Sequence, residues 1–185
     1  VWSHDNDGAG MWWDGFNRDA IVRSNLVEDN TMAGIHYEIS YGHSKIYWNI
    51  VRDNGVHADH PYASKGIYLS NAEGVDVFQN AVAGSDMALH IRADGNRQPA
   101  ARNNEIYEND FEPAAENACN GVGTFSGEGG AATPQAGNQF QGNVWRLKNP
   151  DAAAFCFGDG SRSRLSIDDA PMADEVVGHG GVVDG

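Results

Sequence analysis

Carboxylates, aromatic rings and basic side chains recur at matched positions in the first half of this chain. Asp14 and Glu38 are the two carboxylates, and they lie 24 residues apart. Two carboxylates held close together raise each other's proton affinity, so one can stay protonated as an acid while the other stays ionised. Because a glycosidase needs this division of labour, the pair predicts hydrolysis of glycosidic bonds in a polysaccharide or oligosaccharide, with Asp14 and Glu38 as catalytic residues.

The side chains around this pair are of types that bind sugars. Successive side chains of a strand point to opposite faces, so alternation sorts each segment into inward and outward positions. The outward positions form two rows, which are Trp12, His36, Tyr68 and His90, and Asp14, Glu38, Ser70 and Arg92. Flat aromatic rings stack on sugar rings, and a guanidinium grips an acidic sugar in a bidentate fork. We expect the first row and Arg92 to bind the substrate.

A repeat in the sequence indicates which elements position these rows. One register consists of Asn25, Asn49, Asn80 and Asn104, each three residues after an apolar or small side chain and two before another. The intervals are 24, 31 and 24 residues. A second register lies five residues later, at Asn30, Asn54, Ser85 and Asn109, and Asn6 continues it backwards. A period this short is typical of one coil of three short strands with stacked asparagines at its bends.

The sequence therefore predicts an all-β chain folded as a right-handed parallel β-helix, a solenoid with about 24 residues per coil. Coils lie about 4.8 Å apart, which sets Asp14 beside Glu38 and favours a retaining mechanism. The predicted boundaries are coils over 1–157, a loop insertion at 55–65, an irregular stretch at 112–137 and a C-terminal tail at 158–185. The repeat resumes once after the irregular stretch, at Phe140, Asn143 and Trp145.

The first six residues complete a coil that starts before them. A coil cut in this way exposes apolar faces and strand edges, which solenoids normally cover. We therefore expect upstream coils or an oligomer partner to cover the N-terminal end.

The charge balance excludes some partners. Twelve basic and 26 acidic residues give a net charge of −14, which repels nucleic acid and anionic lipid. Apolar runs all fall short of the roughly 20 residues that cross a bilayer, so we expect no membrane partner. The two cysteines, Cys119 and Cys156, form either one disulfide or two buried thiols, because pairing depends on an oxidising compartment.

Three segments, 10–14, 25–30 and 34–40, resemble the right-handed parallel β-helix repeat family of the pectate-lyase-like superfamily. An Asp followed by a Glu one coil later is similar to the arrangement in β-helical glycosidases of the β-xylosidase type. The resemblance implies that Asp14 is the nucleophile and Glu38 the acid/base. It also implies a secreted or cell-surface protein that acts on carbohydrate. The residues fix no cofactor, and calcium is the candidate under the lyase alternative below.

Two alternatives stay open within this fold. A polysaccharide lyase would use the two carboxylates as calcium ligands and a basic residue such as Arg92 to remove a proton beside a uronate. A non-catalytic solenoid would instead bind glycan or serve as a structural module, such as part of a tailspike or of a cell-surface assembly.

Overall fold

The chain folds into three parallel β-sheets in a computed structural model that describes residues 1–55, 64–94, 97–115, 122–127, 137–148, 155–157, 163–165 and 176–179. Within these ranges every regular element is a strand, and no helix could cross a membrane. Sheet A contains β1 (Trp2–His4), β4 (Leu26–Glu28), β7 (Ile50–Arg52), β10 (Ala81–Ala83), β13 (Asp110–Glu112), β16 (Val144–Leu147) and β19 (Val176–His179). Sheet B contains β2 (Met11–Trp13), β5 (Ile35–Ser40), β8 (Lys65–Ala72), β11 (Met87–Asp94), β14 (Val122–Gly127), β17 (Phe155–Phe157) and β18 (Ser163–Leu165). Sheet C contains β3 (Ile21–Arg23), β6 (Ser44–Tyr47), β9 (Val75–Phe78), β12 (Glu105–Tyr107) and β15 (Gln139–Gln141).

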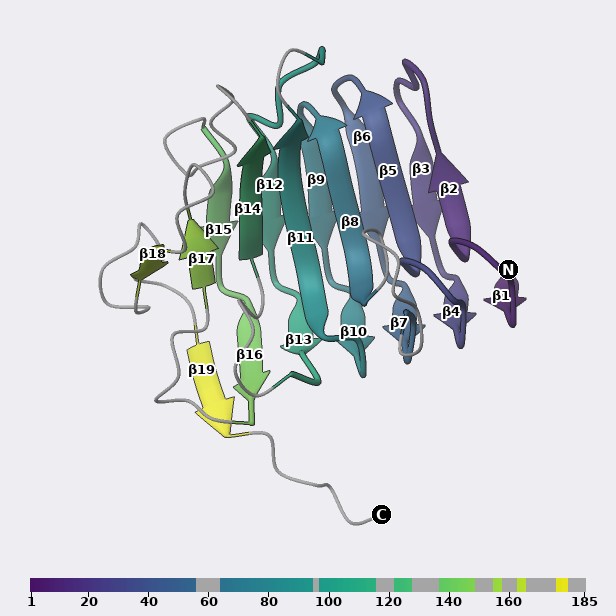
Figure 1. Ribbon diagram of the computed structural model, residues 1–185, viewed down its shortest axis with the longest axis vertical. Coiled ribbons are helices and arrows are strands. Elements are labelled where there is room, and N and C mark those ends of the chain that lie inside the picture. The colour runs from purple at the N-terminus through teal and green to yellow at the C-terminus, as the bar shows by residue number, and fades with distance from the viewer. Residues whose placement is uncertain are drawn as a thin grey trace.

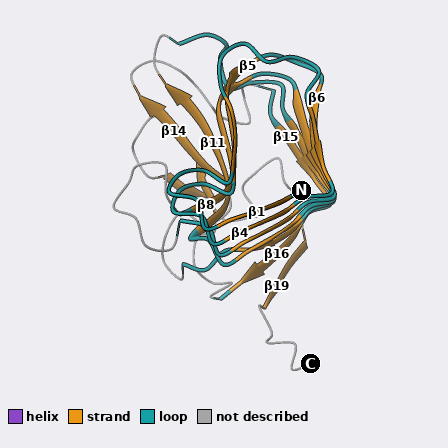
Figure 2. Ribbon diagram, turned by 90° about the vertical axis from the view of Figure 1, so that its right-hand side faces the viewer, coloured by secondary structure: helices purple, strands orange, loops and turns teal. Residues whose placement is uncertain are grey.

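From β2 to β16 each coil contributes one strand to each sheet in the order B, C, A, so β5, β6 and β7 make one complete coil. Figure 1 shows the strands of each sheet stacked side by side, and Figure 2 shows the three sheets as the three sides of the coil. Strands of successive coils pair in parallel, except that β18 pairs antiparallel to β17. The prediction of a right-handed parallel β-helix is thus confirmed.

Asparagine side chains stack at the bends, as the repeat predicts. Asn49 Nδ2 donates to Asn80 Oδ1 at 2.9 Å and to the Val22 carbonyl at 3.0 Å, while its Oδ1 accepts from Asn25 Nδ2 at 2.8 Å. Asn6 donates to Asn30 in the second register, again as predicted. The side-chain amides therefore satisfy buried backbone groups of neighbouring coils.

The predicted register is wrong in the fourth coil. Asn80 stacks on Asn109, 29 residues on, and not on Asn104. Asn104 belongs to a third row that precedes sheet C, where it accepts from the Val75 backbone N–H and donates to Asn138. This coil has 29 residues, five more than the 24 residues of the first interval. Because the two registers are also five residues apart, the extra residues bring Asn109 to the position where a period of 24 would put Asn104. A fixed period of 24 residues therefore lands on the wrong row.

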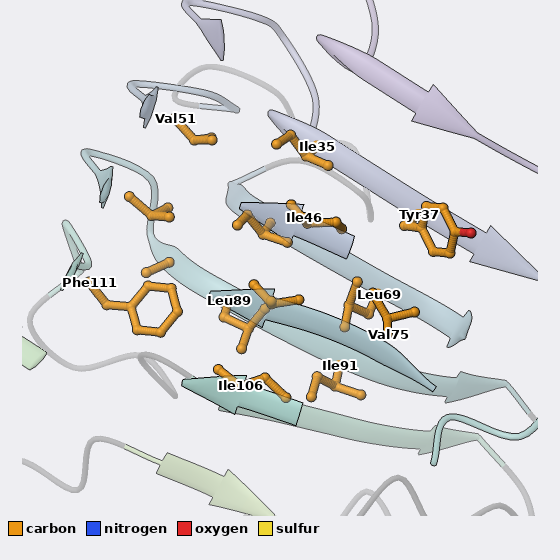
Figure 3. Close-up of a cluster of buried hydrophobic side chains, with 14 of the residues drawn as sticks. Ile35, Tyr37, Ile46, Val51, Leu69, Val75, Leu89, Ile91, Ile106 and Phe111 are labelled. Carbon is orange, nitrogen blue, oxygen red and sulfur yellow. The ribbon is translucent and has the colours of Figure 1, made fainter. Parts of the chain in front are cut away.

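The core fills the inside of the coil with the inward side chains of all three sheets (Figure 3). Alternation correctly predicts the inward positions of sheet B. Of these, Met11 and Trp13 are partly buried, and the fully buried members are Ile35, Tyr37, Ile67, Leu69, Leu89 and Ile91. In the resumed repeat, Phe140 pairs with Ile106 and Trp145 with Phe111, as expected.

The predicted boundaries differ from the structure in two places. The stretch 112–137, predicted to be irregular, contains strand β14, which pairs with β11. The stretch 158–185, predicted to be a tail, contributes β19, which pairs in parallel with β16. The Gly-rich and polar composition of these two stretches does not predict strands. Both strands form because they pair with strands of neighbouring coils, which local apolar alternation does not reveal. Most of the predicted loop insertion, residues 56–63, and Cys119 lie outside the described residues.

At the N-terminal end, β1, β2 and β3 are the edge strands of the three sheets. Val1, Trp2 and Ile21 at this end are 79%, 62% and 63% exposed. Covering of this end by other coils or by a partner chain stays a prediction.

Candidate functional site

The predicted first row, Trp12, His36, Tyr68 and His90, forms a stack of rings on the outward face of sheet B, here called the aromatic ladder. Trp12 pairs with His36, His36 with Tyr68, and Tyr68 with His90 on successive strands. The Trp12 and His36 rings lie nearly parallel, with centroids 5.2 Å apart and an interplanar angle of 8°. The centroid of the Tyr68 ring lies 4.5 Å from that of His36 and 5.1 Å from that of His90. The prediction that these four rings form one row is therefore correct.

Exposure along this ladder differs from the expectation of an open sugar platform. Trp12 is 53% exposed, whereas His36 and Tyr68 are fully buried and His90 is 7% exposed. Alternation fixes the side of the sheet on which a side chain lies, but not whether other parts of the chain cover that side. Only the Trp12 end of the ladder offers a ring to a ligand.

Described side chains from outside the rows help to cover this face. The Lys65 ammonium lies over the Tyr68 ring, 5.2 Å from its centroid. Arg97 Nη1 reaches to 3.5 Å from Glu38 Oε1. Asn71 Nδ2 donates to the Pro99 carbonyl at 3.1 Å, which ties the segment after β11 to the end of β8. The sequence does not predict these roles of Lys65 and Arg97, because alternation assigns Lys65 inward and Arg97 lies outside the strands.

Glu38 lies where the two rows meet. Glu38 pairs with Ser70 of β8, the strand on one side of β5. Asp14 directly follows β2, the strand on the other side of β5. Glu38 Oε2 is 3.6 Å from His36 Nε2. Burial raises the pKa of the Glu38 carboxyl and the charge of Asp14 raises it further, whereas a hydrogen bond from Trp12 and the charge of Arg97 lower it.

The deeper part of this face combines cations with neutral imidazoles. Burial lowers the pKa of His36 to about 4, with a further contribution from the Lys65 charge, so His36 is neutral at pH 7 and its contact with Glu38 is not an ion pair. Burial also lowers the pKa of Lys65 to about 8, assisted by Arg92, and that of His90 well below its usual value. His90 Nδ1 is buried without a hydrogen-bond partner in the described structure.

Arg92 occupies the position that the second row predicts, opposite Ser70. Its Nη1 lies 3.4 Å from the Tyr68 hydroxyl. A guanidinium does not lose its proton in proteins, so Arg92 is suited to binding and not to proton removal. Its permanent charge therefore favours a binding role for Arg92 over the role of lyase base.

The described residues do not form a metal centre. They contain no group of three or more His, Cys, Asp or Glu side chains placed to hold an ion. His36 and His90 are separated by the ring of Tyr68 and by a whole coil, whereas a metal–nitrogen bond is about 2 Å long. The residues that the structure describes on this face therefore do not provide a set of three metal ligands.

The three stacked sheets and their asparagine rows define a parallel β-helix solenoid with an aromatic ladder on one face. Residues 2–151 match the family described as periplasmic copper-binding protein (NosD), and the chain belongs to this family. The comparisons with curated proteins and with solved structures found no match. Family membership supports the β-helix and does not support a glycosidase.

Proposed function

We propose that this chain is a glycan-binding solenoid of the cell envelope that holds a sugar at the Trp12 end of sheet B. The observation that carries the proposal is the Trp12 ring, which lies parallel to the buried His36 ring and is 53% exposed on the edge strand β2. The proposal requires that whatever covers the N-terminal end leaves this ring open. A rigid exposed indole presents a flat apolar surface for a sugar ring at little entropic cost. The family description, which is that of a periplasmic protein, supports this location.

Polar groups next to Trp12 complete a sugar site. Asp14 is exposed at the end of β2, and the Arg97 side chain is 54% exposed where it meets Glu38. Carboxylates and a guanidinium accept from and donate to neighbouring sugar hydroxyls. These charged groups lie on rigid strands or contact them, so the site needs little rearrangement to bind.

Replacement of the Trp12 ring tests the proposal. We expect Trp12→Ala to weaken binding to its glycan, found by screening immobilised oligosaccharides, about tenfold or more in calorimetry. Trp48→Ala is the matched control, since Trp48 is 56% exposed but lies in the turn after β6. Equal affinities of the two variants, or the absence of any glycan ligand, would rule out this site.

Hydrolysis is a second candidate that one observation favours. The pKa of Glu38 is raised by burial and by Asp14, which is the environment of a general acid beside an ionised carboxylate. In this mechanism Asp14 attacks the anomeric carbon while Glu38 protonates the leaving oxygen, and water later releases the sugar with Glu38 as base. The contact with Arg97 opposes this role because it lowers the pKa of Glu38.

Product release separates hydrolysis from binding. If the pair is catalytic, the wild-type chain releases reducing ends from its glycan, and Glu38→Gln and Asp14→Asn each abolish release while binding persists. Far-ultraviolet circular dichroism checks that both variants keep their strands. If the wild-type chain releases no reducing ends from its glycan on prolonged incubation, hydrolysis is ruled out and glycan binding stands as the proposed function.

A further inference from the structure

A groove of about 560 Å³ runs along the corner where sheet B leads into sheet C. It crosses four successive coils, from Arg18 and Asp19 before β3, through Tyr41 and Gly42, to Asn103 and Glu105 at β12. This corner groove contains none of the ladder residues of sheet B. It is therefore a separate site on the solenoid.

Two glycines keep the corner groove hollow. Gly42 and Gly74 stack in neighbouring coils, and a Cβ on Gly74 would lie 3.0 Å from the Cα of Gly42. Gly74 has φ of +67°, which side chains other than glycine rarely adopt, whereas Gly42 has no such restriction. A Cβ on Gly42 would meet nothing closer than the Glu73 carbonyl oxygen at 3.9 Å, so the floor of the groove is bare backbone with room above it.

The walls of the groove leave a negative charge without a matching cation. Asp76 and Glu105 lie directly opposite each other on β9 and β12, and like charges in this position repel. Lys45 Nζ is 3.9 Å from Asp76 and Arg102 Nε is 3.0 Å from Glu73, but no cation pairs with Glu105 in the described part of the chain. A ligand with one positive charge near Glu105 would remove this repulsion.

Other groups in the groove suit a hydroxylated ligand. His43 and Asn103 line it with hydrogen-bonding side chains, and the Arg18 guanidinium lies 5.2 Å from the centroid of the Tyr41 ring. Arg18 shows that this wall already accepts one cation from the chain itself. Acidic, aromatic and amide groups around a cavity of this size match a sugar unit better than an apolar ligand.

We propose that the corner groove binds a sugar unit that carries a free amine, with its ammonium between Asp76 and Glu105 and its hydroxyls on His43, Asn103 and Arg18. The site is independent of Trp12, so it does not depend on the glycan site proposed for sheet B. Acidic sugars are repelled by the same carboxylates.

Calorimetry with two oligosaccharides of equal length tests the charge requirement. The probes are a tetrasaccharide of β-1,4-linked glucosamine and its fully N-acetylated counterpart, at a mildly acidic pH where the free amines are protonated. We expect the charged probe to bind and the acetylated probe to bind about tenfold more weakly or not at all, with a difference that shrinks at high salt. Equal binding of the two probes, or no binding of either, overturns the proposal.

Two variants locate the binding to the groove. Gly42→Leu fills the floor without backbone strain and should abolish binding of the glucosamine tetrasaccharide. Glu105→Gln should weaken it about fivefold, since the ammonium loses one exposed charge partner. Trp12→Ala should leave it unchanged, which separates this site from the one on sheet B. Unchanged affinity in Gly42→Leu, or in a folded Glu105→Gln if the leucine variant does not fold, contradicts the assignment.

Discussion

At the scale of single residues, the interior asparagines support the coil more than their polar type suggests. Asn49 is 1% exposed and links the coils on either side through its side-chain amide. We expect Asn49→Ala to lower the free energy of unfolding by about 2–4 kcal/mol, because it leaves buried groups of Asn25 and Val22 without partners. Asn6→Ala, at the exposed end of the second register, is the matched control and should cost clearly less. Urea unfolding measures both, and equal losses would contradict a role for the buried stack.

His36 gives the fold a dependence on pH. Its pKa is about 4 in the folded chain against 6.5 ordinarily, so the unfolded chain binds the proton more readily between these values. The stability that this residue contributes is full above pH 6.5 and falls by about 3 kcal/mol as the pH drops to 4. His36→Phe keeps a ring between Trp12 and Tyr68 but does not titrate. We expect the loss of stability between pH 7 and pH 4 in urea unfolding to be about 3 kcal/mol smaller in this variant than in the wild type. An unchanged pH dependence would show that His36 does not carry it.

At the scale of the strand, the tight approach of coils depends on glycine just before sheet B. A Cβ on Gly34 would lie 2.5 Å from Val51 Cγ1 and 2.9 Å from the Gly66 carbonyl oxygen. We expect Gly34→Ala to destabilise the chain by about 1–3 kcal/mol, since β5 and the coil beside it would have to separate. Gly8→Ala is the control, because a Cβ there meets nothing within 4 Å. Thermal unfolding followed by circular dichroism compares them, and a Gly34 variant as stable as the control would show that the coils can yield.

At the scale of the whole molecule, the net charge of −14 opposes compaction. Ion pairs such as Arg52 with Glu28 and Arg146 with Asp110 offset only part of the repulsion between the acidic side chains. Because salt screens repulsion between exposed charges, we expect the melting temperature to rise as sodium chloride is increased from low concentration to 0.5 M. A melting temperature that falls over this range would mean that the ion pairs outweigh the general repulsion.

The sequence by itself determined the architecture, because its signals are local and repeat. An apolar residue, an asparagine three residues later and another apolar residue two beyond place a bend between two strands wherever they recur, as at Phe140, Asn143 and Trp145. Alternation likewise placed Ile35 and Tyr37 inward and His36 outward.

Only the tertiary structure decided which bends stack and which outward residues meet solvent. Asn104 and Asn109 fit the same local pattern, and the length of the fourth coil, not the residue type, selects Asn109 as the partner of Asn80. Trp12 and Tyr68 occupy equivalent outward positions, yet Trp12 is exposed while Lys65 lies over the buried Tyr68. The corner groove depends on the stacking of Gly42 on Gly74, which lie 32 residues apart. Burial and cavities arise from contacts between coils, and spacing within one coil does not encode them.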